Sequence, residues 1–135
     1  MLLEYLEKHK ITFVYVPLIV YWLVLLIATS IPGSEFPDIQ VSDKIEHFTG
    51  YGLLTILITF TLLVQTKYKM IRKRAYLAAV VIVSLYAALD ELHQIFIPGR
   101  NCDIYDWSAD FAAACFGVIV VYSLVKFVRF SPKKT

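Results

Sequence analysis

The chain has 135 residues, of which 59% are hydrophobic and 18% are charged, and its mean hydropathy is +0.66. This composition is too apolar for a soluble domain of that length, and it indicates an integral membrane protein with room for about four spanning helices of roughly 20 residues each. A separate soluble catalytic domain does not fit, and the net charge of +2, with basic residues concentrated in one loop and at both ends, argues against nucleic-acid binding.

Four long apolar segments follow one another along the chain. They cover residues 11–29, 46–65, 75–97 and 107–128. These runs are too long for strands and lack period-two alternation, and a barrel of so few strands could not close. We therefore predict an all-α membrane protein with four transmembrane helices in a single domain, residues 1–135.

The first segment also has some features of a signal peptide. Lys8 and Lys10 precede it, and small residues follow its apolar core. However, the core is long for a signal peptide, and Pro32 would follow closely after any cleavage point. A spanning helix is the preferred interpretation, and Pro17 near its start is tolerable as a kink in a membrane helix.

The charges of the loops predict the orientation in the membrane. The 66–74 loop contains five Lys or Arg residues, whereas the 30–43 loop contains acids and no base. By the positive-inside rule, residues 66–74 and both termini face the cytoplasm. The 30–45 and 98–106 loops then face outward from the inner membrane, in which we expect a multi-pass protein.

Ionisable side chains gather at the outward ends of the predicted helices. Asp43, His47 and Tyr51 follow one another at steps of four residues, so they share one face of the second helix. Lys44 lies beside them. The third and fourth helices place further polar residues at the same end: Asp90, Glu91, His93, Gln94, Asp106 and Asp110.

Asp90 is the residue that most needs an explanation. It lies about seven residues before Ile97, or roughly 10 Å below the predicted helix end at 1.5 Å per residue. A carboxylate at that depth costs about 2.5–3.5 kcal/mol on insertion scales, so it has to face the bundle interior or a wet cavity. Lys44, His47 and Arg100 are its candidate partners, because all three belong to the same membrane face. We therefore predict a polar pocket that opens outward.

The residue pattern does not assign a metal site. Asp90 and His93 are spaced i, i+3, with His47 and Glu91 near, and carboxylates with imidazole can bind zinc or iron. However, the sequence contains no HExxH, CxxC or repeated ExxH motif. No metal and no other cofactor is predicted.

Three motifs occur in order along the chain: DKIEHFTGYGLL at 43–54, DELHQIFIPGR at 90–100 and DWSADFAAACFG at 106–117. In this combination the chain resembles the VanZ-like family of small bacterial membrane proteins, over roughly residues 20–122. One departure is Ala113, where the family pattern has glycine. The resemblance implies a four-helix membrane protein and a link with low-level resistance to the glycopeptide teicoplanin. The family pattern falls on Asp43, Lys44, His47, Tyr51, Asp90, Glu91, Gln94, Pro98, Gly99, Arg100, Asp106, Asp110 and Gly117.

The leading hypothesis is that the chain binds or modifies a cell-envelope component at the outer membrane face, with lipid-linked envelope precursors as the substrate class. If it is an enzyme, Asp90 or Glu91 acts as general base and His47 as a second acid or base. Arg100 or Lys44 then clamps a phosphate or carboxylate. The candidate substrate-binding residues are Lys44, Tyr51, Gln94, Arg100, Asp106 and Asp110.

One alternative is a non-catalytic membrane protein in which the same polar cluster locks the helices together or docks a partner. A transporter or proton pathway is less favoured, because the inner halves of all four helices are nearly uncharged. Membrane lipids are expected partners in each case, and the sequence leaves catalysis and the oligomeric state open.

Overall fold

A computed structural model of the chain describes residues 2–32 and 43–130, with side chains up to residue 128. These ranges are helical and contain no β-strand. Most of the predicted 30–45 loop lies outside the described residues, as do residue 1 and residues 131–135. The helices are α1 (Leu2–Lys8), the π-helix η1 (Ile11–Tyr15), α2 (Val16–Ser30), α3 (Asp43–Val64), α4 (Lys69–Lys73), α5 (Ala75–Gln94) and α6 (Ile104–Phe130).

Four helical stretches are long and apolar enough to cross a membrane. They are Ile11–Ser30, Asp43–Val64, Ala75–Gln94 and Ile104–Val128. The predicted all-α fold with four spanning helices is therefore confirmed. Inside the first span, η1 and α2 join in one helix, and the Val16 N–H donates to the Ile11 carbonyl, five residues back. This wider π turn comes directly before Pro17, which has no N–H of its own to donate.

The helix ends differ from the predicted ones by a few residues. Helix α5 ends at Gln94 rather than at residue 97, because the chain turns through Pro98 and Gly99, where Gly99 has a φ of 75°. Helix α6 begins at Ile104 rather than at 107. There the Asp103 carbonyl accepts from the Asp106 and Trp107 N–H groups, so the first turn of the helix starts earlier.

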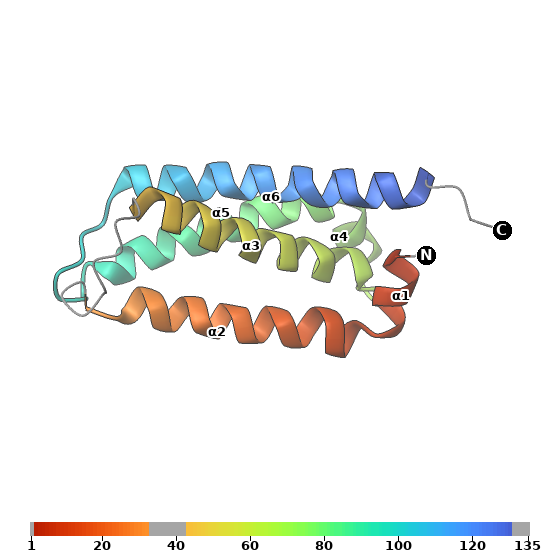
Figure 1. Cartoon of the computed structure of the whole chain (residues 1–135), viewed down its shortest axis with the longest axis horizontal. Helices are drawn as coiled ribbons and strands as arrows, with labels where there is room; N and C mark the ends of the chain where they lie inside the picture. Colours follow the sequence, from red (N-terminus) through yellow and green to blue (C-terminus); the bar gives the residue numbers. More distant parts are fainter. Residues whose placement is uncertain (1, 33–42, 131–135) are drawn as a thin grey trace.

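The long helices lie side by side and alternate in direction along the chain (Figure 1). α2 and α5 end, and α3 and α6 begin, at one end of the bundle, which we call the polar end. Helices α1 and α4 lie at the opposite end, with the last turns of α6. Helix α3 is central, because it makes its most extensive contacts with α6 and then with α5.

Helices α3 and α6 approach each other closely at Gly117. A Cβ atom at Gly117 would lie 2.9 Å from the Gly52 carbonyl oxygen and 2.9 Å from Thr55 Cβ. Only glycine fits there, as small residues allow close packing of membrane helices. The backbones of α3 and α6 therefore pack closely at the level of Gly52 and Gly117.

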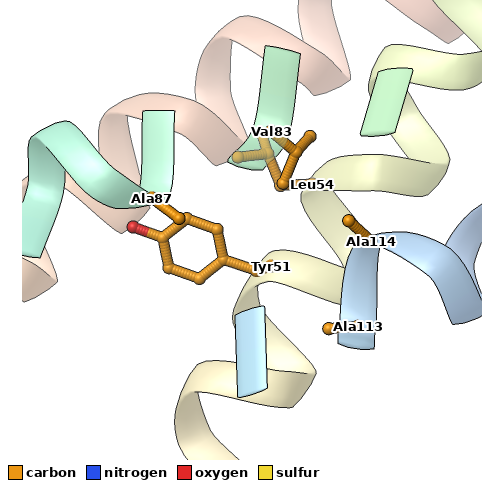
Figure 2. Close-up of a cluster of buried hydrophobic side chains, with 6 residues drawn as sticks. All are labelled: Tyr51, Leu54, Val83, Ala87, Ala113 and Ala114. Carbon is orange, nitrogen blue, oxygen red and sulfur yellow. The ribbon is translucent and has the colours of Figure 1, made fainter. Parts of the chain in front are cut away.

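The main apolar core lies next to the polar end. Tyr51 and Leu54 of α3 are buried against Ala113 and Ala114 of α6, and Val83 and Ala87 of α5 complete the cluster (Figure 2). Ala113, where the family pattern has glycine, is fully buried and packs against Gly52. A smaller cluster nearer the opposite end contains Leu63, Ala75 and Val121.

The outer surface of the bundle is apolar. Leu23, Ile27 and Leu85 are each more than half exposed, as are many other large apolar side chains. Thr29 is the one buried residue of α2. Because so large an exposed apolar surface suits a lipid environment and not water, the chain is a membrane protein.

Candidate functional site

The polar end of the bundle contains most of the buried polar side chains of the described residues. They come from four helices, α2, α3, α5 and α6. The members are Thr29, His47, Asp90, Glu91, Gln94, Asp106 and Asp110.

Asp90 is held by hydrogen bonds from three helices. Its Oδ1 accepts from the Thr29 hydroxyl at 2.9 Å, and its Oδ2 accepts from the Tyr51 hydroxyl at 2.7 Å and from Gln94 Nε2 at 3.3 Å. The side chain is only 3% exposed. Since both oxygens are engaged, Asp90 connects α2, α3 and α5 at one level of the bundle.

His47 and Asp110 form a second buried pair, between α3 and α6. His47 Nδ1 lies 3.1 Å and 3.3 Å from the two carboxylate oxygens of Asp110, which is 0% exposed. The imidazole stacks in parallel with the Tyr51 ring, with 6.1 Å between the ring centroids. The i, i+4 spacing of His47 and Tyr51 therefore places the Asp90 and Asp110 clusters side by side.

Glu91 uses its two oxygens differently. Oε2 accepts from the Asp103 backbone N–H at 2.8 Å and so anchors the chain just before α6. Oε1 is buried, lies 3.9 Å from His47 Nδ1, and has no hydrogen-bond partner among the described residues. Glu91 therefore places an unused acceptor beside the imidazole.

Lys44 does not take the position expected for it. The sequence suggested Lys44, His47 and Arg100 as partners of Asp90. His47 pairs with Asp110 instead, and Lys44 Nζ lies 3.1 Å from Asp106 Oδ1 and 3.6 Å from Asp103 Oδ2. Lys44 is three residues before His47, on the side of α3 that faces the start of α6. It therefore joins those two helices at the surface, while hydroxyl and amide groups bond to Asp90 instead.

Two adjoining hollows open at the polar end. A cavity of about 150 Å³ lies between α2, α3 and the end of α5, and its wall includes His47 and Tyr51. A more polar hollow of about 340 Å³ lies over the turn between α5 and α6. Asp43, Gln94 and Arg100 line both, so the two hollows form one continuous site.

The structure brings the residues singled out from the sequence to one end of the bundle. His47, Glu91 and Asp110 lie within a single cluster, whereas Arg100 lines the hollows. Sequence reasoning missed two participants. Thr29 gave no signal beyond a hydroxyl near the end of the first apolar segment. Asp103 could have been suspected, because aspartate is a preferred residue at a helix N-terminus. In the structure its side chain accepts from the Tyr105 N–H at the start of α6.

Two groups among the described residues have the side chains to hold a metal ion. One is His47, Glu91 and Asp110, all buried, and the other is Asp43, His47 and Asp106, with Asp43 exposed. In each group the ligand atoms lie within 4.8 Å of one another. The Asp90 and His93 pair considered from the sequence is in neither group.

Comparison with known proteins supplies a family. The model of the VanZ/LLP1 family matches residues 12–126, which is most of the chain and includes all the buried polar residues described above. Neither the search of curated proteins nor that of solved structures found a match. The match covers four apolar helices and the three motifs at their polar end, and the chain therefore belongs to the VanZ/LLP1 family.

Proposed function

We propose that the chain binds a lipid-linked component of the cell envelope at the polar end of the bundle, on the outer side of the inner membrane. The observation that carries this proposal is the site itself. Next to the buried ionisable side chains, a largely apolar cavity and a more polar hollow open together at one end of a bundle whose sides are apolar. Ionisable side chains buried at membrane depth are costly, and they usually mark sites of function.

The outward orientation is supported by the charges at the opposite end. Helix α4 contains Lys69, Arg72 and Lys73 within five residues, and it lies beside α1. Basic segments of this kind stay in the cytoplasm. The hollows lined by Arg100 then face the outside.

The lining of the site suits an amphiphilic ligand. Leu25 and Ala28 of α2 give the smaller cavity an apolar wall, while Gln94 and Arg100 offer hydrogen-bond donors. A guanidinium is a strong partner for phosphate, and the exposed apolar face of α2 borders the cavity where a lipid chain would lie. A lipid with a phosphorylated head group meets these features.

The link of the family with teicoplanin resistance agrees with this ligand class. A protein that holds a lipid-linked precursor at the outer face would alter the access of a glycopeptide to it. Should the chain also modify its ligand, Glu91 fits the role of general base better than Asp90, because Asp90 has both oxygens engaged and Glu91 has one free.

The test is ligand binding by the full chain in lipid nanodiscs. We expect tighter binding of a polyprenyl diphosphate than of the matching polyprenol. Arg100→Gln should weaken diphosphate binding roughly ten- to a hundredfold, the range for loss of a hydrogen bond to a charged group. Arg72→Gln is the matched control at the opposite end. Equal binding of the two lipids, or equal losses in the two variants, would contradict the proposal.

A structural lock is the second candidate function, and one observation favours it. The hydrogen bonds from Thr29, Tyr51 and Gln94 to Asp90 join three helices. In a purely structural role, variants of these residues lower stability, and binding falls only as the folded fraction falls.

A further inference from the structure

Three side chains with metal-binding atoms meet in the interior of the polar end. His47 comes from α3, Glu91 from α5 and Asp110 from α6, and each is less than a tenth exposed. We propose that these three residues bind a divalent transition-metal ion of the zinc or manganese class. The proposal goes beyond envelope-lipid binding, because the ion would be held whether or not a lipid is bound.

The separations between the ligand atoms fit a metal centre. Tetrahedral zinc with bonds of about 2.0–2.2 Å places its ligand atoms roughly 3.3–3.6 Å apart. His47 Nδ1 lies 3.1 Å from Asp110 Oδ1 and 3.9 Å from Glu91 Oε1. All three ligand atoms lie within 4.8 Å of one another, so side-chain rotation would bring them round one ion.

The unused oxygen of Glu91 is a second, independent observation. Glu91 is 3% exposed, and Oε1 accepts no hydrogen bond from the described residues while it lies beside the imidazole. A buried carboxylate oxygen without a donor is unfavourable. Oε2 of the same residue is fixed by the Asp103 N–H, so the free oxygen is held in place toward the cluster.

The local charge also favours a cation. Glu91 and Asp110 are two buried carboxylates beside a single imidazole, and the nearby ammonium of Lys44 is already paired with Asp106 and Asp103. A divalent ion with two carboxylates and a neutral histidine gives a centre with no net charge. Buried charges in proteins are normally paired or bound to a metal in this way.

The ligand types select the class of ion. Calcium takes six to eight oxygen ligands, and magnesium keeps most of its waters and binds through carboxylates and phosphates, so neither matches one imidazole and two carboxylates. Zinc and manganese accept this mixture. Three protein ligands leave a coordination position open, and His47 also lines the cavity, so an incoming phosphate or water could reach the ion.

The alternative group, Asp43, His47 and Asp106, fits less well. Asp43 is exposed, and Asp106 is engaged by the Lys44 ammonium at 3.1 Å. Asp43 Oδ1 lies 3.9 Å from His47 Nε2, the ring nitrogen that faces away from Asp110. If His47 binds the metal through Nδ1, Asp43 lies next to the other ring nitrogen. Carboxylates commonly accept a hydrogen bond from that nitrogen in metal-bound histidines.

Metal uptake by the purified full chain in nanodiscs, without added lipid ligand, tests the proposal. The protein is treated with a chelator, loaded separately with Zn²⁺, Mn²⁺ or Co²⁺, desalted and analysed for bound metal by mass spectrometry. We expect one ion per chain for at least one of these metals. With Co²⁺ we expect a visible absorption band that is lost in His47→Ala.

Matched variants locate the ion. Loss of a residue that only hydrogen-bonds a metal ligand lowers metal affinity roughly 10–100-fold. Glu91→Gln and Asp110→Asn remove ligands themselves, so each should lower the metal affinity by more than that. Asp106→Asn, another buried acid of α6, should keep the stoichiometry, and Asp43→Asn should cost less than Glu91→Gln. Wild-type protein that retains none of the three metals would overturn the proposal. The opposite pattern of variants would also overturn it: metal uptake lost in Asp43→Asn and Asp106→Asn but kept in Glu91→Gln and Asp110→Asn.

This measurement separates the two proposals. Metal uptake without diphosphate binding leaves the metal site standing and removes the lipid proposal. Binding of the polyprenyl diphosphate by a chain that takes up no metal leaves the lipid proposal standing and removes the metal site.

Discussion

The two ends of the bundle handle charge in opposite ways. At the end with α1 and α4, Arg72 and Glu7 form an ion pair 3.0 Å long in which both side chains remain more than a third exposed. At the polar end, Asp90, Glu91 and Asp110 are almost completely buried. Charges at the first end are solvated and contribute little to stability, whereas those at the polar end need specific partners from other helices. Burying these carboxylates costs desolvation free energy, so their presence favours a functional role over a purely stabilising one.

The largest expected effect comes from removing one partner of the buried pair. Asp110→Ala leaves His47 without its carboxylate and opens a gap between α3 and α6. We expect a loss of about 3–5 kcal/mol in the free energy of unfolding, the range for one broken buried pair. Thermal unfolding of the detergent-solubilised protein, followed by tryptophan fluorescence, measures it.

The matched control for this variant is Arg72→Ala, which breaks the exposed pair at the opposite end. Arg72→Ala should lower the free energy of unfolding by at most about 1 kcal/mol. Similar losses in the two variants would show that the ends do not differ in the way the burial indicates.

A smaller effect is expected from the network around Asp90. Tyr51→Phe keeps the ring in the core but removes the hydroxyl that donates to Asp90 Oδ2 at 2.7 Å. We expect a loss of about 1–2 kcal/mol, as for other hydrogen bonds between membrane helices. The same unfolding measurement applies, and Tyr105→Phe, at an exposed tyrosine, should leave the stability unchanged.

The arrangement of the helices was largely predictable, because it depends on the length and hydropathy of each segment. Four apolar runs predict four spanning helices, and only their ends differ from the structure. The ends depend on local bonds, such as those of the Asp103 carbonyl at the start of α6, which hydropathy does not contain.

The site was predictable only in part. Helical spacing correctly placed His47 and Tyr51 on one face, and topology placed the acids at the same end. The pairings between helices were not predictable, because they depend on how each helix is rotated and how closely it approaches its neighbour. The close approach of α3 and α6 at Gly117 is seen only in the structure, and so is the hydrogen bond from Thr29 to Asp90.

The outward orientation of the polar end can be measured directly, because a native cysteine lies there. Cys102 is exposed in the segment between α5 and α6, whereas Cys115 lies half-buried within α6. A membrane-impermeant maleimide applied to spheroplasts from cells that express the chain should label the wild type, and Cys102→Ser should lose the label. Met70→Cys in that background reports on α4 at the opposite end and should react only after permeabilisation. Labelling of the Met70→Cys variant in sealed spheroplasts, together with wild-type Cys102 that reacts only after permeabilisation, would contradict the outward-facing site.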